Sequence, residues 1–187
     1  APEGITGPFL LTVGALERRK NYLRTMEAFE RSGLAAQGWT YVFCGPRGNA
    51  ADEITARARR TQGVVQLGYV SDAELQWLYR NAGGFVLVSL LEGFGIPALE
   101  AAQRGLVSLV GDGGAQREAV GEGALHADPL SVEAITDGLR RLTTLPPEDR
   151  ASRVALARDH AARLSREAFA AAWRRLLLSE GRLQVSR

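Results

Sequence analysis

Residues 85–104 read FVLVSLLEGFGIPALEAAQR and contain the clearest signal of the fold. The run Phe85–Val88 is continuously apolar, which is typical of a strand buried on both faces of a parallel sheet. Gly93 and Gly95 then permit a tight turn with unusual backbone dihedrals. Pro97 fits the first turn of a helix, where its missing N–H group costs nothing. The stretch therefore predicts one strand–turn–helix unit of an α/β domain.

The same alternation extends along the chain in both directions. Short β-prone runs predict strands at 9–13, 40–44, 64–67, 85–88 and 107–110. Helical patterns are found at 21–32, 52–60, 72–81, 96–104, 131–142, 148–164 and 167–179. Ser71 and Glu74 form a capping box that opens one of these helices, and residues 181–187 are expected to fray. We predict an α/β fold with a Rossmann-like doubly wound parallel sheet, helices on both faces and further C-terminal helices.

The overall composition excludes several classes of protein. A length of 187 residues is typical of one domain. The net charge is only +2 and the arginines are scattered beside acidic residues, so the sequence does not indicate the basic patch of a nucleic-acid-binding protein. Cys44 is the one cysteine, so an intrachain disulfide is excluded and a buried core position is expected. No run approaches the ~18 apolar residues of a membrane span. Residues 1–4 lack the features of a signal peptide, so a cytoplasmic location is expected.

Four predicted strand–helix joints carry loops rich in glycine, charge or both. They are 14–20, 45–49, 89–97 and 111–118. Ligands of open α/β sheets bind beyond the carboxyl ends of the strands, so these loops predict a ligand site at one edge of the sheet. The histidines stand too far apart in the pattern for a metal site or a catalytic triad.

Glu92 and Glu100 flank the most specific of these loops. The free N–H groups of the helix that starts there are suited to a diphosphate. Carboxylates bind phosphates poorly but accept hydrogen bonds from sugar hydroxyls. We therefore expect Glu92 and Glu100 to hold two hydroxylated groups, a sugar and a ribose, at opposite ends of a ligand. Either residue alone would be interpreted as a surface charge, and it is their combination after a buried strand that favours a site.

The loop from Gly14 to Asn21 is the second piece of the predicted site. It carries three consecutive cations, Arg18-Arg19-Lys20, which would neutralise a diphosphate, although a solvated basic turn is the alternative. After the third strand, backbone groups near Val70 could read a base edge. Glu118 is either a ligand contact or an acidic residue favoured by the helix dipole.

These segments together resemble a known family. The stretch from Glu92 to Glu100 is similar to the E-x7-E motif of the retaining glycosyltransferases of family 4, which have the two-Rossmann-domain GT-B architecture. Residues 13–21 resemble that family's phosphate-binding loop, and residues 67–75 resemble its base-binding turn. Residues 44–48, 111–121 and 127–130 match other strand-end loops, so the similarity covers residues 9 to 142.

The resemblance implies a role for each matching residue. Glu92 would contact the donor sugar, and Arg19 and Lys20 would bind the phosphates, which makes these three the implied catalytic set. Glu100 would bind the ribose, and Val70 would meet the base through its backbone. The full implied nucleotide-binding set is Gly14, Val70, Gly93, Phe94, Gly95, Ile96 and Glu100. Many relatives carry arginine where this chain has Ala15, and many have a proline near residues 114–117, where this chain has none.

The resemblance also implies the partners of the chain. The donor substrate would be a nucleotide-diphosphate sugar, with no other cofactor and no metal. Residues 1–187 would be the single donor-binding domain of a two-domain enzyme, whose N-terminal acceptor domain is absent and would supply any peripheral membrane contact. The isolated domain is therefore expected to bind donor but transfer little. The alternatives are half of a nucleotide-sugar epimerase and a non-catalytic nucleotide-binding module.

Overall fold

The structure is a computed structural model that describes residue 2 and residues 4–180. Its centre is a parallel sheet with the strand order β3-β2-β1-β4-β5-β6. The strands are β1 (Phe9–Val13), β2 (Thr40–Cys44), β3 (Val64–Gly68), β4 (Gly84–Leu87), β5 (Ser108–Gly111) and β6 (Leu125–Ala127). The five predicted strands are confirmed, each within one residue of its expected bounds. The sequence prediction missed β6, because a strand of three residues carries too little periodicity to be recognised.

The direction of strand addition reverses beside β1. From β1 the chain adds β2 and then β3 on one side, and it returns to place β4 on the other side. Leu11 thus pairs with Val42 of β2 and with Phe85 of β4. Ligands of open α/β sheets bind beyond the carboxyl ends of the strands at such a reversal point.

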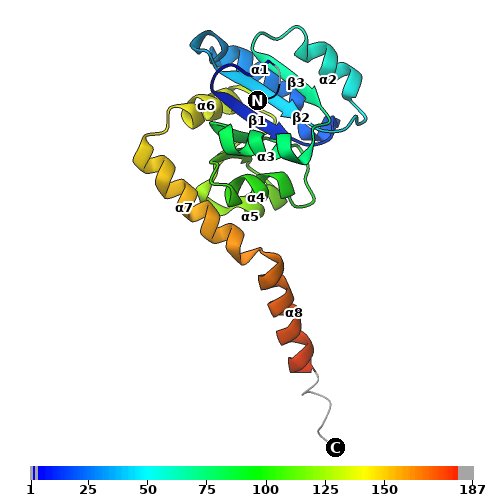
Figure 1. Ribbon diagram of the computed structural model, residues 1–187, viewed down its shortest axis with the longest axis vertical. Helices are drawn as coiled ribbons and strands as arrows, with labels where there is room; N and C mark the ends of the chain where they lie inside the picture. Colours follow the sequence, from blue (N-terminus) through cyan, green and yellow to red (C-terminus); the bar gives the residue numbers. More distant parts are fainter. Residues whose placement is uncertain (1, 3, 181–187) are drawn as a thin grey trace, which may run out of the picture.

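Helices cover both faces of the sheet, as the sequence predicts (Figure 1). One core cluster takes side chains from α1 (Tyr22–Ser32), α2 (Ala51–Ala58) and α6 (Val132–Thr143). The other takes side chains from α3 (Asp72–Asn81), α4 (Ile96–Gln103) and α5 (Gly114–Val120). The strands contribute to both clusters, which explains their nearly continuous apolar character.

Two helices follow the sheet. α7 (Pro147–Arg163) packs against α4 and against η3 (Gly121–Gly123), a turn of 3-10 helix. α8 (Arg166–Glu180) leads away from the body of the domain and exposes apolar side chains, among them Phe169 and Trp173 (Figure 1). No helix in the described part of the chain is long and apolar enough to cross a bilayer. The expected fraying of residues 181–187 falls outside the described residues.

The carboxyl ends of β1 and β2 approach each other closely at Gly45. The Gly14 N–H group donates to the Cys44 carbonyl at 2.9 Å, and Gly45 has a φ of +148°. A Cβ atom added to Gly45 would lie 2.1 Å from the Gly14 carbonyl oxygen, so only glycine fits. Cys44 is buried as predicted, and burial raises the pKa of its thiol to about 11.

We expect Gly45→Ala to lower the free energy of unfolding by about 3 kcal/mol, because the new methyl group overlaps backbone that cannot move without disturbing β1. Gly38→Ala is the matched control. Gly38 also has a positive φ but has nothing within 4 Å of an added Cβ, so conformational strain of about 1 kcal/mol is the expected cost. Urea unfolding of both variants measures the difference. Equal losses would mean that the close approach is unimportant.

His126 is a part-buried residue of β6. Burial lowers the pKa of its imidazole, and the nearby Arg117 charge lowers it further, while Asp112 and Glu122 act in the opposite direction. A histidine whose pKa is lower in the folded protein than in the unfolded chain favours folding while it is neutral. Its contribution is therefore complete above pH ~6.5 and is lost as the pH falls below that value.

We expect the free energy of unfolding to fall between pH 7.5 and pH 5.5, and to fall less in His126→Gln, which cannot gain the proton. Urea unfolding of both proteins at the two pH values gives this comparison. An identical pH dependence in the two proteins would show that His126 does not contribute.

Candidate functional site

The loops after β1 and β4 meet at the reversal point of the sheet. After β1 the chain makes one turn of 3-10 helix, η1 (Arg18–Lys20), and this turn carries the Lys20 side chain into the interior. The N–H group of Leu90, in the loop after β4, donates to the Arg19 carbonyl at 2.7 Å. Gly14 lies beneath Lys20, since a Cβ atom at Gly14 would meet Lys20 Cε at 3.4 Å. The tertiary structure therefore brings Gly14, Arg19 and Lys20 of the predicted site together.

Glu92 is the acceptor on which the side chains of both loops converge. Its Oε1 accepts from Lys20 Nζ at 2.6 Å and from the Ser89 hydroxyl at 2.7 Å. Its Oε2 accepts from the Arg19 guanidinium at 3.0 Å. Lys20 and Glu92 are 7% and 6% exposed, so this pair is shielded from water, whereas Arg19 is 41% exposed. Sequence reasoning placed Glu92 beside the cations but did not predict that they bond to it directly.

The same side chains keep unused hydrogen-bonding capacity. Lys20 has three N–H bonds and one acceptor among the described residues. Arg19 uses Nε toward Glu17 and one terminal nitrogen toward Glu92 and the Leu91 carbonyl, and the other terminal nitrogen has no acceptor among those residues. Arg19, Lys20, Glu17 and Glu92 carry no net charge together. The network would therefore attract an anion through its unused N–H donors and not through a net positive charge.

The start of α4 supplies further donors next to this network. Gly95 is its N-cap, with φ of +92°, and Pro97 stands in its first turn. Among the hydrogen bonds of the described residues, none uses the N–H groups of Phe94, Gly95 or Ile96. Free N–H groups and the helix dipole favour an anion at this position. Gly93 is exposed and has nothing within 4 Å of an added Cβ, so the approach to this turn is open.

Two cavities flank the loop that carries Glu92. The smaller, of about 210 Å3, lies between this loop and the start of α5, and its walls include Ser89, Leu90, Glu92, Gly114 and Gln116. A water molecule occupies ~30 Å3 in the liquid, so the cavity has room for a group such as one sugar ring. Glu92 is thus the charged group of a small pocket with mostly backbone and apolar walls.

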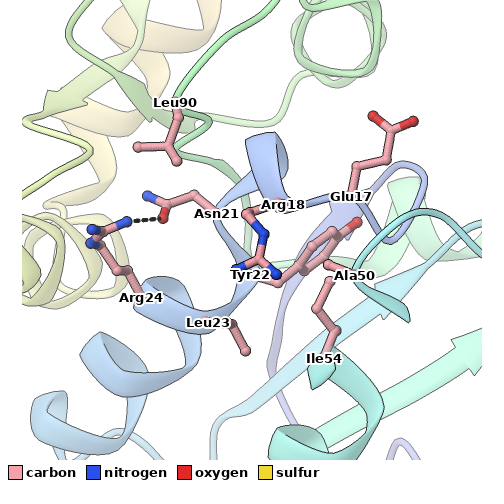
Figure 2. A pocket seen from close by; sticks show the side chains of 9 residues that line it. All are labelled: Glu17, Arg18, Asn21, Tyr22, Leu23, Arg24, Ala50, Ile54 and Leu90. Carbon is pink, nitrogen blue, oxygen red and sulfur yellow. Dashed lines mark hydrogen bonds between the residues drawn. The ribbon is translucent and has the colours of Figure 1, made fainter. Parts of the chain in front are cut away.

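The larger cavity, of about 530 Å3, lies on the other side of Leu90, which lines both. Figure 2 shows Arg24 and Asn21, joined by a hydrogen bond of 3.1 Å, near Leu90, while Glu17 and Ile54 lie on the opposite side. The charge of Arg18, which also lines it, is paired with Glu53 at 3.0 Å. Neither Lys20 nor Glu92 lines this cavity, and Glu17, the partner of Arg19, is the member of the charged network that does.

Glu100 belongs to a second group of contacts, on the α3 side of α4. Its Oε2 accepts from the Tyr79 hydroxyl at 3.0 Å. Val70, expected near a base, packs partly buried against the core cluster of that face, while Tyr69 is 86% exposed. Glu92 and Glu100 thus have separate sets of partners, and their roles at opposite ends of one ligand stay a prediction.

Two buried amides near the site were missed by sequence reasoning. Asn21, with φ of +61°, donates from Nδ2 to the Val88 carbonyl at 2.9 Å and to the Pro129 carbonyl at 2.7 Å. Gln116 donates to the Leu87 carbonyl at 2.6 Å. Asparagine tolerates the left-handed conformation, which is the one signal that Asn21 offered. Gln116 gave none, because its partner is distant in the sequence.

A metal site would need several His, Cys, Asp or Glu side chains close together. In residues 2 and 4–180, no group of three or more His, Cys, Asp or Glu residues is arranged to hold a metal ion.

Glu118 was predicted to be either a ligand contact or an acidic residue favoured by the helix dipole. Its side chain is exposed, and its backbone carbonyl bonds to the His160 ring at 2.6 Å. The contacts of these site residues with a ligand stay predictions.

The sequence of this chain is similar to those of known glycosyl transferases. The family model described as "Glycosyl transferases group 1" matches residues 3–160. The O-antigen chain mannosyltransferase B of Escherichia coli is 33% identical over 132 residues, which are 68% of this chain and 35% of that protein. The GDP-mannose:cellobiosyl-diphosphopolyprenol alpha-mannosyltransferase of Komagataeibacter xylinus is 39% identical over 77 residues, 39% of this chain and 20% of that protein.

The fold has solved counterparts at low sequence identity. The crystal structure of a UDP-forming alpha,alpha-trehalose-phosphate synthase from Burkholderia xenovorans superposes with a TM-score of 0.79 at 20% identity. The match covers 96% of this chain and 45% of that one. The Rossmann-like fold is thereby confirmed. The chain spans about a third or less of the length of the curated relatives, and less than half of this solved chain.

The buried ion pair predicts a non-additive effect on stability. Lys20→Met leaves Glu92 buried without its closest cation, and Glu92→Gln leaves Lys20 without a carboxylate, so each should cost about 3 kcal/mol. The double variant removes both charges and should cost less than the sum of the two by at least about 1 kcal/mol. Urea unfolding at neutral pH measures all three. Additive losses would mean that the two charges do not stabilise each other.

Proposed function

Because this chain belongs to the glycosyl transferases of group 1, we propose that it binds a nucleoside diphosphate sugar, the donor for retaining glycosyl transfer. One observation carries the proposal. The buried Glu92 carboxylate holds Lys20 and Arg19 beside a helix start with free N–H groups. A carboxylate suited to a sugar hydroxyl and donors suited to a diphosphate thereby lie next to each other. They are found at the reversal point of the sheet, where ligands of such folds bind.

The diphosphate is proposed to lie against Arg19, Lys20 and the N–H groups of Phe94, Gly95 and Ile96. Glycosyl transfer leaves the negative charge of the departing nucleoside diphosphate on the oxygen that was bonded to the sugar. Donors that are already fixed in place stabilise such developing charge without reorganisation. Glu92 supports this role because it fixes both cations through hydrogen bonds of 2.6 and 3.0 Å. The proposal assigns the stabilisation to these donors and needs no divalent metal.

The sugar is proposed to occupy the small cavity beside Glu92. A carboxylate has about four acceptor positions. Lys20, Ser89 and Arg19 each use one of these positions on Glu92. About one position therefore remains for a sugar hydroxyl. Glu92 would then have two functions, since it orients the cations and also contacts the sugar ring.

The nucleoside is proposed to extend toward the α3 side of α4. Glu100 would accept the ribose hydroxyls, the backbone at Val70 would meet the base, and Gly14 would allow the phosphates to approach β1. The separation of the Glu100 contacts from those of Glu92 supports this direction. The side chain of Ala15 has no group that binds a phosphate, so the proposal assigns phosphate binding in this loop to Arg19 and Lys20.

We propose mannose as the transferred sugar and guanosine as the nucleoside. Both curated relatives reported above are named as mannosyltransferases, and the name of one includes GDP-mannose. The superposed solved structure is named as UDP-forming, but at 20% identity it supports the fold alone. A uridine donor is therefore the competing outcome in the binding experiment.

Acceptor binding is proposed to require a further domain of the parent enzyme. The curated relatives are about three to five times as long as the segments that match this chain. α8 exposes Phe169, Trp173 and Leu177, apolar side chains of the kind that are buried between domains. We propose that the 187-residue chain binds donor and performs little or no transfer by itself.

The proposal predicts that the purified chain binds GDP and GDP-mannose in calorimetry more tightly than UDP, UDP-glucose and ADP. Glu92→Gln keeps the shape of the side chain but makes the network positive. It should leave GDP binding equal or tighter and weaken GDP-mannose about tenfold relative to GDP, because the acceptor of the sugar hydroxyl loses its charge.

Arg18→Gln, whose guanidinium bonds to Glu53 and not to Glu92, is the matched control and should change neither affinity by more than about twofold. Failure of all five ligands to bind a folded chain would overturn the donor-binding proposal and favour a non-catalytic module. Preference for the uridine ligands would retain donor binding and reject guanosine.

A further inference from the structure

Tyr79 is a buried phenol that contacts the predicted ribose end of the site. It lies in α3 with 0% of its surface exposed, and its ring stacks on Phe85 with a centroid separation of 6.0 Å. Its hydroxyl lies 3.0 Å from Glu100 Oε2 and 3.4 Å from the Pro97 carbonyl oxygen. A phenol has one proton to donate, and the nearer, charged acceptor is the carboxylate.

Arg104 holds the other side of this contact. Its guanidinium lies 4.7 Å above the centre of the Tyr79 ring, and it donates to the Glu100 backbone carbonyl at 3.1 Å. In the described part of the chain no ion pair forms between Arg104 and the Glu100 carboxylate. Arg104 thus fixes the ring and the backbone and leaves the carboxylate available.

The phenol stays a donor at neutral pH. Burial raises the pKa of Tyr79 well above its ordinary value, and the Glu100 carboxylate raises it further. The Tyr79 hydroxyl is consequently protonated wherever Glu100 is ionised, and the hydrogen bond between them keeps its direction from phenol to carboxylate.

One oxygen of Glu100 is fixed by this bond and the other is free. Within residues 2 and 4–180, Oε2 has the Tyr79 partner and Oε1 has none, and the side chain is part-exposed. Loss of rotamer freedom is one of the costs of binding, and a carboxylate that is already held in one orientation avoids it. The arrangement suits recognition of a hydroxyl that approaches Oε1 from solvent.

We propose that Tyr79 is a positioning residue for Glu100, and that the pair selects a ribose over a sugar without the 2′ and 3′ hydroxyls. The inference rests on the proposed function, since it assumes that Glu100 lies at the nucleoside. It adds a specificity determinant that sequence patterns did not suggest, because Tyr79 precedes Glu100 by 21 residues on another helix.

Tyr79→Phe tests the proposal because it deletes one oxygen and keeps the ring on Phe85 and beneath Arg104. The measurement is the calorimetric Kd of the 187-residue chain for GDP and for 2′,3′-dideoxy-GDP. The unmodified chain should prefer GDP by at least about tenfold. In Tyr79→Phe the affinity for GDP should fall about fivefold to tenfold, while that for 2′,3′-dideoxy-GDP changes less than twofold.

The matched control is Tyr41→Phe, which also removes a buried phenol oxygen, here one that bonds to Thr12 at 2.9 Å. It should leave the preference for GDP unchanged. Circular dichroism and thermal unfolding confirm that both variants fold.

Glu100→Gln separates failure of the inference from failure of the proposed function. If Glu100→Gln abolishes the preference and Tyr79→Phe does not, Glu100 reads the ribose and the role of Tyr79 is rejected. Equal weakening of both ligands in Tyr79→Phe would show a structural role only, and would also overturn the inference. If the unmodified chain binds neither ligand, the guanosine-donor proposal fails, and the inference fails with it.

Discussion

Lys20 and Glu92 come from loops that leave the sheet on opposite sides of its reversal point, and their contact of 2.6 Å joins those loops. Both side chains are almost completely buried, so neither charge can be solvated if the other moves away. The pair therefore fixes the distance between η1 and the start of α4. The ion pair and the bond from the Leu90 N–H group to the Arg19 carbonyl together set the position of Arg19 relative to the free N–H groups at that helix start.

Neutral hydrogen bonds complete the same junction. The last carbonyl groups of the β4 segment, at Leu87 and Val88, accept from Gln116 of α5 and from Asn21 before α1. A buried carbonyl without a partner is costly, so these amides allow the chain to leave the sheet without that penalty. Asn21 also bonds to the Pro129 carbonyl, so one residue connects the ends of three loops. The charged network thus rests on a framework of satisfied backbone groups.

The geometry divides the proposed donor site into two chemical regions linked by α4. At its start lie the cations, Glu92 and the free N–H groups, which suit a diphosphate and one sugar. Within the helix, Glu100 lies against Tyr79 and presents one free oxygen. Glu100 is held on α4 and Glu92 is held in the preceding loop by its bonds to Lys20, Arg19 and Ser89, so the protein itself restrains the position of each carboxylate.

The sequence by itself determined the strand–helix alternation, the five longer strands and the capping box at Ser71 and Glu74, because these depend on local periodicity and on contacts within one turn. It also predicted which loops carry the candidate site, since glycine and charge after a buried strand are visible in the pattern. The edge strand at Leu125–Ala127 was too short to give such a signal.

Which side chains meet could not be predicted from the local pattern. Glu92 binds Lys20 from 72 residues away, Gln116 reaches Leu87 across 29 residues, and Tyr79 reaches Glu100 between two helices. Local pattern placed Glu92 and Glu100 at the correct loop and helix but could not show what their oxygens already contact. That depends on the order in which parallel strands are added to the sheet, which brings together residues with no local relation in the chain.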